Sequence, residues 1–197
     1  GLQRNEQPPT PNLRDQINEK LRARSAEYLE EGELNVRICT WNVANQAPPS
    51  NIRELNEWLL DGDDVADVVA VGLQEVEFGG AALMLEVTDA SVSWMEAITD
   101  CLNRAHPGVR YKKIDTAQLV GLVLVLVVRT ELLEQVKHVK KSVTRSGAIS
   151  GVMGNKGAIG LHASIQGKRF LFISAHFHAH DGNTKLRNSN YHDAMAQ

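Results

Sequence analysis

The stretch "DVVAVGLQEVE", Asp67 to Glu77, runs through six apolar or glycine residues and then turns polar at Gln74 and Glu75. A continuous apolar run of this kind, rich in valine, is typical of a strand that is buried on both faces. Strands of this type belong to sheets that are covered on both sides. The stretch therefore predicts a mixed α/β fold with a covered sheet at its centre.

Further strands and helices are predicted around this run. Apolar alternation and turn residues indicate strands over residues 34–43, 110–116, 119–129, 136–144, 158–165 and 168–177. Helical periodicity and capping residues indicate helices over residues 10–32, 51–62 and 92–104, and from about residue 184 onward. No repeat interrupts this order, so residues 34–197 are expected to form one α/β body, preceded by a helical extension over residues 1–33.

Composition limits the class of protein. The 197 residues are 43% hydrophobic and 23% charged, which is ordinary for a globular chain. A net charge of −3 argues against a protein that binds nucleic acid through an overall positive charge. The two cysteines, Cys39 and Cys101, give no disulfide framework and favour a reducing, cytoplasmic location. The longest apolar run, Leu119 to Val128, is too short to span a bilayer.

Polar side chains stand where three of the predicted strands end. These strands deliver Asn42, the pair Gln74 and Glu75, and His176. A carboxylate, an amide and an imidazole fit a hydrolase that uses a hard cation: Glu75 would hold Mg²⁺ through oxygen, Asn42 would orient the metal shell or a phosphate oxygen, and His176 would bind an anionic substrate. The alternative is that polar residues simply mark strand ends.

The segment "SGVMGNKGAIG", Ser150 to Gly160, has four glycines and one lysine. It is not a nucleotide P-loop, because Lys156 is followed by Gly157 and then by a strand. It can present Asn155 and Lys156 to an anionic group, or it can be a plain turn. Upstream, Lys137 and its neighbours in "VKHVKKSVTR" indicate either a solvated edge strand or a surface for peripheral contact with an anionic membrane.

Taken in order, the motifs "TWNV", "GLQEVE", "LVGLVLVLVVR", "GVMGNKGAIG" and "SAHFHAHDGNTKLRNSNYHD" resemble those of the inositol polyphosphate 5-phosphatases, in the endonuclease/exonuclease/phosphatase superfamily. The resemblance runs from about Val36 to the end of the sequence. Its most specific parts are "GNKG" and the His-x-x-x-His followed by "RNxxY". It implies a deoxyribonuclease-I-like fold of two packed sheets flanked by helices.

The resemblance also implies a reaction and a site. The reaction is removal of the 5-phosphate from a phosphoinositide lipid or a soluble inositol phosphate, with Mg²⁺ as cofactor. Glu75 would bind the metal with Asn42 beside it, and His176 would contact the scissile phosphate. The other implied substrate contacts are Asn155, Lys156, His180 and Arg187.

The chain departs from the family pattern at three points. Asn190 stands where the family usually has aspartate, and His178 occupies a position that the pattern leaves free. Two later family blocks, which supply the aspartate that positions water and a final Asp and His, do not occur in the sequence. We therefore expect the N-terminal part of a catalytic domain, apparently truncated at its C-terminus. Two alternatives stay open: a non-catalytic phosphoinositide-binding remnant, and another superfamily hydrolase such as a nuclease or a sphingomyelinase.

Three histidines recur at alternate positions, His176, His178 and His180. In a strand they would share one face, which raises the alternative of a zinc site. Metallo-β-lactamase-like hydrolases use the order His-x-His-x-Asp-His, whereas Asp181 here comes one position too late. The pattern favours one catalytic histidine, His176, with the other two in lesser roles.

Overall fold

The computed structural model describes residues 12–27, 32–60, 64–77, 87–146 and 156–196. The chain divides into two compact units, Gly1–Glu33 and Leu34–Gln197. Within the described ranges, no helix is both long enough and apolar enough to cross a membrane.

The first unit contains one helix, α1 (Leu13–Ala23), followed by a short 3-10 turn, η1 (Ser25–Glu27). Asn12 caps α1, because its side chain accepts a hydrogen bond from the backbone N–H of Asp15 at 3.0 Å. The helix predicted over residues 10–32 is therefore too long. The capping side chain starts it at Leu13, and the chain tightens into the 3-10 turn before the predicted end.

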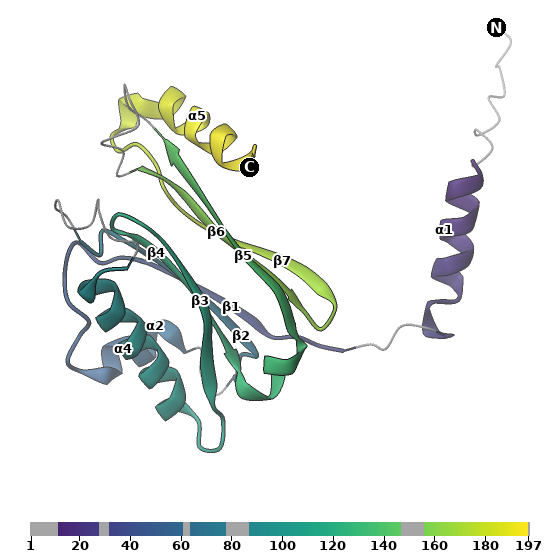
Figure 1. The fold of residues 1–197 in the computed structure, drawn as a ribbon, viewed down its shortest axis with the longest axis horizontal. Helices are drawn as coiled ribbons and strands as arrows, with labels where there is room; N and C mark the ends of the chain where they lie inside the picture. The colour runs from purple at the N-terminus through teal and green to yellow at the C-terminus, as the bar shows by residue number, and fades with distance from the viewer. Residues whose placement is uncertain (1–11, 28–31, 61–63, 78–86, 147–155, 197) are drawn as a thin grey trace, which may run out of the picture. The chain divides into compact units, whose positions relative to one another are not determined.

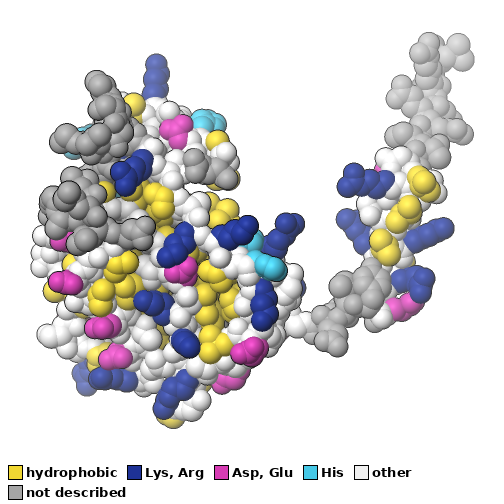
Figure 2. All heavy atoms as spheres, viewed as in Figure 1, with side chains coloured by type: hydrophobic (Ala, Val, Ile, Leu, Met, Phe, Trp, Pro, Cys, Tyr) yellow, Lys and Arg dark blue, Asp and Glu magenta, His cyan; other side chains and the backbone are white. Residues whose placement is uncertain are grey.

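The apolar stripe of α1 is not buried. Leu13, Ile17 and Leu21 are all exposed, and Figure 2 shows hydrophobic side chains on the surface of this helix with lysine and arginine side chains beside them. No residue of α1 is buried. Within the described residues of this unit, capping and helix propensity are what stabilise α1.

The first sheet of the second unit has the strand order β1-β2-β4-β3. Its strands are β1 (Val36–Asn42), β2 (Val68–Gln74), β3 (Tyr111–Leu119) and β4 (Leu122–Arg129). The first two pair in parallel and the other pairs are antiparallel. Figure 1 shows two helices on one face of this sheet, α2 (Ile52–Leu59) and α4 (Asp89–Ala105). Every residue of β2 from Val68 to Leu73 is buried, as the apolar run predicts.

The strand predicted over residues 119–129 is confirmed from Leu122 onward, but it starts too early, because a hairpin turn occupies its first residues. Val120 adopts a positive φ of 52°, and β4 begins only after Gly121. A Cβ at Gly121 would lie 2.6 Å from the backbone oxygen of Glu77, so only glycine fits there. The Gly121 carbonyl also accepts a hydrogen bond from the N–H of Val76 at 2.9 Å. The turn thus packs against the segment that follows β2.

The second sheet is antiparallel, with the order β5-β6-β7. Its strands are β5 (Val136–Ser146), β6 (Lys156–Ile165) and β7 (Lys168–His176). The 3-10 turn η2 (Thr130–Gln135) leads into it, and η3 (Asp181–Asn183) and the helix α5 (Thr184–Met195) follow it. Figure 1 shows this sheet packed on the face of the first sheet opposite α2 and α4. The second unit is therefore a two-sheet sandwich flanked by helices.

The core has two layers. One apolar cluster fills the space between the helices and the first sheet and includes the fully buried Trp94 and Ile98. The other lies between the two sheets and includes Leu126 and Leu161. The central strands β2 and β4 supply side chains to both clusters, so these two strands are apolar on both faces.

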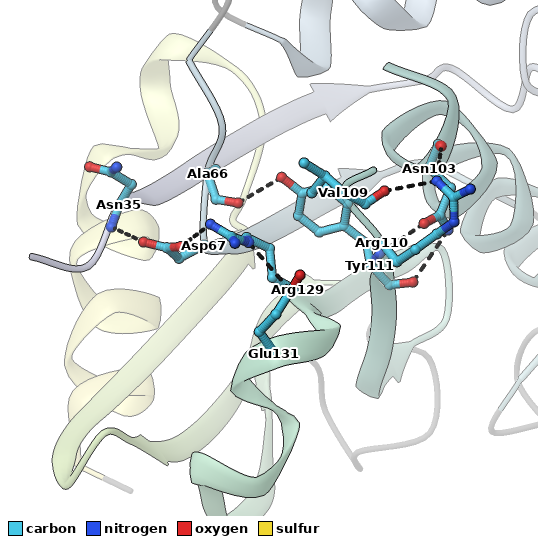
Figure 3. A network of polar contacts seen from close by, with 9 residues as sticks. All are labelled: Asn35, Ala66, Asp67, Asn103, Val109, Arg110, Tyr111, Arg129 and Glu131. Atoms are coloured by element: carbon cyan, nitrogen blue, oxygen red, sulfur yellow. Dashed lines mark hydrogen bonds and ion pairs between the residues drawn. The ribbon is translucent and has the colours of Figure 1, made fainter. Parts of the chain in front are cut away.

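A polar network fixes the end of the first sheet where β2 begins (Figure 3). Asp67 forms an ion pair with Arg129 at 3.0 Å and accepts a hydrogen bond from the N–H of Asn35 at 2.9 Å. The hydroxyl of Tyr111 donates to the carbonyl of Ala66 at 2.6 Å. These contacts anchor β2 at its start, and its other end carries the candidate site.

Candidate active site

The ends of β1 and β2 lie side by side. Asn42 pairs with Gln74 in the parallel register, and the N–H of Val43 donates to the Gln74 carbonyl at 2.9 Å. One residue on, Glu75 has a φ of +58°, which is uncommon for a residue with a side chain. Its carbonyl accepts a hydrogen bond from the N–H of Asn45 at 2.6 Å. The strand ends sharply here, and loop contacts hold the backbone of Glu75.

Gln74 connects the two sheets. Its side-chain nitrogen donates to Thr40 on β1 at 3.1 Å and to Ser174 on β7 at 3.4 Å. Beside it, a Cβ at Gly72 would lie 2.7 Å from the Ser174 hydroxyl, so the sheets approach closely at this point. The sequence identifies Gln74 only as a polar residue at a strand end and assigns it no role. The one further hint in the sequence is its partner Ser174, a polar residue at a buried position of β7.

His176, at the end of β7, has two charged residues close to the same ring nitrogen, one from β6 and one from the segment that follows β2. Its Nε2 is 2.9 Å from Nζ of Lys156 and 3.6 Å from a carboxylate oxygen of Glu75. Lys156 is the first residue of β6, whose Gly157 pairs with His176. The structure thus brings together three predicted site residues that are far apart in the sequence and come from both sheets. Their spacing suits binding of an anion beside a carboxylate.

The environment keeps His176 uncharged at neutral pH. Burial lowers the pKa of its imidazole below the ordinary value of 6.5, and the positive charge of Lys156 lowers it further. Glu75 acts in the opposite direction, but its effect is the smallest of the three. Because an ammonium group can only donate, the short contact with Lys156 makes Nε2 an acceptor and leaves the ring proton on Nδ1.

The residues predicted to hold the metal provide one carboxylate and one amide. Glu75 is partly buried, and Asn42 lies on the adjacent strand end, where its side-chain oxygen accepts a hydrogen bond from the N–H of Ala44 at 3.1 Å. Among the described residues, no three His, Cys, Asp or Glu side chains gather into a metal cage. A sparse set of oxygen donors fits Mg²⁺, which keeps several waters and binds through one or two carboxylates and the phosphates of its substrate.

The three histidines do not continue a strand. β7 ends at His176, so the shared face expected from alternation does not extend to the other two. The Nδ1 of His178 is 2.7 Å from the side-chain oxygen of Asn190 on α5. His180 is exposed and has a φ of 73°. The zinc alternative depends on a strand that the chain does not form there.

The remaining predicted substrate contacts lie near this segment or outside the described residues. The guanidinium of Arg187 donates to the backbone carbonyls of His180 at 2.6 Å and His178 at 3.3 Å, and so holds the loop after β7. A substrate contact by Arg187 or His180 stays a prediction. Asn155 lies outside the described residues.

Comparison with known proteins places this geometry in a family. The model of endonuclease/exonuclease/phosphatase family 2 matches residues 39–197. The chain belongs to this family. The match covers the ends of β1, β2 and β7, and with them all the candidate site residues.

Two curated relatives show what this family-2 chain is similar to. The type II inositol 1,4,5-trisphosphate 5-phosphatase of Mus musculus is 29% identical over 160 residues, covering 81% of this chain and 15% of the relative. Synaptojanin-2 of Homo sapiens is 30% identical over 185 residues, covering 85% and 12%. The chain thus spans under a fifth of the length of these relatives. The resemblance predicted from the motifs is confirmed.

A solved structure shows the same fold. The inositol polyphosphate 5-phosphatase domain of SPsynaptojanin, in complex with inositol (1,4)-bisphosphate and a calcium ion, aligns with a TM-score of 0.76 at 24% identity. The alignment covers 93% of this family-2 chain and 52% of that domain's chain. The predicted two-sheet sandwich flanked by helices is confirmed.

Proposed function

We propose that the protein hydrolyses the 5-phosphate ester of phosphoinositides or soluble inositol phosphates, as part of a phosphoric monoester hydrolase. The observation that carries this proposal is the meeting of Glu75, Lys156 and His176 from two different sheets. Its relatives support the substrate class, because they include an inositol trisphosphate 5-phosphatase and phosphatidylinositol phosphatases.

His176 and Lys156 would receive the phosphate. Lys156 supplies a positive charge at the end of β6, and a phosphate oxygen can take the hydrogen bond that its ammonium now gives to His176. An uncharged His176 can then hold a proton toward the phosphate or accept one as charge develops. Partial burial strengthens both interactions, because water screens them less.

We infer that Mg²⁺ is the cofactor and that Glu75 would hold it, with Asn42 beside it. When bound, the ion supplies positive charge that neutralises the transferring phosphoryl group. The support is the chemistry of the donors, a carboxylate and an amide oxygen on adjacent strand ends. The related synaptojanin domain binds calcium, which is also a hard cation that prefers oxygen ligands.

The basic strand β5 supports peripheral contact with an anionic membrane. Lys137, Lys140 and Arg145 are exposed, and each such charge near an anionic surface contributes about 1 kcal/mol. Lys141 is different, because its ammonium pairs with Asp115 at 2.9 Å and donates to the Thr116 carbonyl at 2.8 Å. We propose a cytoplasmic, membrane-peripheral location from these charges and from the free cysteines.

Phosphate release by the full-length protein tests this function. With Mg²⁺, inositol 1,4,5-trisphosphate should release phosphate, whereas inositol 1,4-bisphosphate and DNA should not react. Glu75→Gln should lower kcat by about 10²- to 10³-fold, as loss of a charge-stabilising group does. Glu134→Gln, the same change at an exposed residue of η2, is the control and should retain full activity.

Two outcomes would contradict the proposal. Cleavage of DNA in preference to the inositol phosphate would indicate a nuclease. Binding of the inositol phosphate without metal-dependent turnover, unaffected by Glu75→Gln, would indicate a non-catalytic binding protein.

A further inference from the structure

Asn190 is the buried residue of α5 within the described chain. Its side chain is polar, yet only 3% of the residue is exposed, whereas the rest of the helix lies mainly at the surface. A buried amide is costly unless it is hydrogen-bonded, so its partners indicate its role. Its side-chain oxygen faces two atoms of His178.

The two contacts fix each other's hydrogen-bonding roles. The backbone N–H of His178 lies 3.3 Å from the side-chain Oδ1 of Asn190, and a backbone N–H can only donate. The atom that faces it must therefore be the amide oxygen, which can only accept. The His178 ring atom Nδ1, 2.7 Å from the same oxygen, must then carry a proton.

We propose that Asn190 is a positioning residue of the site: its amide oxygen binds the backbone and ring N–H groups of His178 and holds the segment after His176 in one conformation. Arg187, three residues earlier on α5, supports the same segment through the carbonyls of His178 and His180. The helix thus holds both the N–H and the C=O of His178. Its link to catalysis rests on the proposed function.

The pair also joins two departures from the family pattern. His178 occupies a position that the pattern leaves free, and Asn190 replaces the usual aspartate. A carboxylate at position 190 could accept the same two hydrogen bonds, but it would add a negative charge against His178, which is two residues from His176 in the sequence. The amide provides the bonds without that charge, so the charges that act on His176 remain those of Lys156 and Glu75.

The ¹⁵N spectrum of the histidine rings in the full-length protein tests the contact without reference to activity. The wild-type protein and Asn190→Asp should both show His178 with its proton on Nδ1, because either oxygen accepts it. Asn190→Leu, of similar size but without an acceptor, should lose this tautomer preference. A wild-type His178 with its proton on Nε2 would overturn the proposal.

The values of kcat and KM then test whether Asn190 positions the segment after His176. Asn190→Leu should lower kcat about tenfold with KM changed less than about twofold, because a displaced catalytic group costs rate more than binding. Asn190→Asp should restore kcat to within about threefold, since both hydrogen bonds persist. Ser189→Leu, an exposed neighbour on α5, is the control and should change neither the kinetics nor the spectrum.

The remaining outcomes are also decisive. If Asn190→Leu does not fold, His178→Ala is used in its place. The His178 ring is only half-buried, so this variant should fold. It should lose about threefold in kcat, because it lacks the hydrogen bond between the ring and Asn190 but keeps the one from the backbone N–H. Unchanged kcat in the variant used would overturn positioning. If the wild-type protein shows no turnover, the proposed function fails, and the tautomer alone decides whether Asn190 holds the segment.

Discussion

The two sheets of the second unit are built from different sequence patterns. In β4 every residue from Leu122 to Val128 is buried, because helices cover one face of the first sheet and the second sheet covers the other. In β7 burial alternates, with Phe172 inside and Leu171 and Ile173 exposed. The difference shows that the first sheet is the structural centre, whereas the second contributes one face to the core. Both sheets supply polar side chains to the site at one shared end.

The largest contrast between the two sheets is expected in the unfolding free energy that is lost when one leucine in each is truncated to alanine. Leu126→Ala, at a fully buried position between the sheets, should lower the free energy of unfolding by about 2–5 kcal/mol, because it leaves a cavity. Leu171→Ala, at a residue that is 57% exposed, should cost within about 0.5 kcal/mol. Urea unfolding of the two variants measures both values, and similar costs would contradict the one-sided burial of the second sheet.

Closing the space between the sheets beside the site should have a smaller effect. In Gly72→Ala the new methyl group contacts two atoms of Ser174. The Ser174 hydroxyl can rotate away, but the Cβ of Ser174, 3.1 Å from the methyl group, cannot. The expected loss is about 1–2 kcal/mol of unfolding free energy. Ser174→Gly in the same chain should recover most of that loss. A neutral Gly72→Ala would show that the sheets do not approach closely there.

The sequence predicts those features that depend on local pattern. The apolar run before Glu75 indicates a doubly covered strand, and the polar residues after it indicate a strand end, so β2 and its end are predicted well. The turn at Gly121, within the long apolar run, is not predicted. Glycine is required there because the backbone of Glu77, more than forty residues earlier in the chain, lies against it.

The site is predictable to a similar extent. Family motifs and strand ends identify Glu75, Lys156 and His176 as candidates, but only the packing of two sheets brings them together. The family pattern singles out Asn190, but its contact with His178 is not predicted, since His178 lies on a loop whose path no local pattern specifies. Long-range packing is what the sequence alone does not show.

The most direct test of the central claim, that residues from both sheets form one site, is the pH titration of the His176 ring by NMR in metal-free protein. In the wild-type protein the pKa of His176 should lie below 6.5, because burial and Lys156 lower it. The native state then binds fewer protons than the unfolded state between that pKa and 6.5, so this residue makes stability rise with pH across that window.

The two charge-removing variants should shift this titration in opposite directions. Lys156→Met should raise the pKa of His176 toward its ordinary value, and Glu75→Gln should lower it further, because Glu75 is the group that raises it. Lys112→Met, an exposed lysine near the other end of the first sheet, is the control and should leave it unchanged. Opposite shifts would place Glu75, Lys156 and His176 in one site. No shift in either variant would contradict the account.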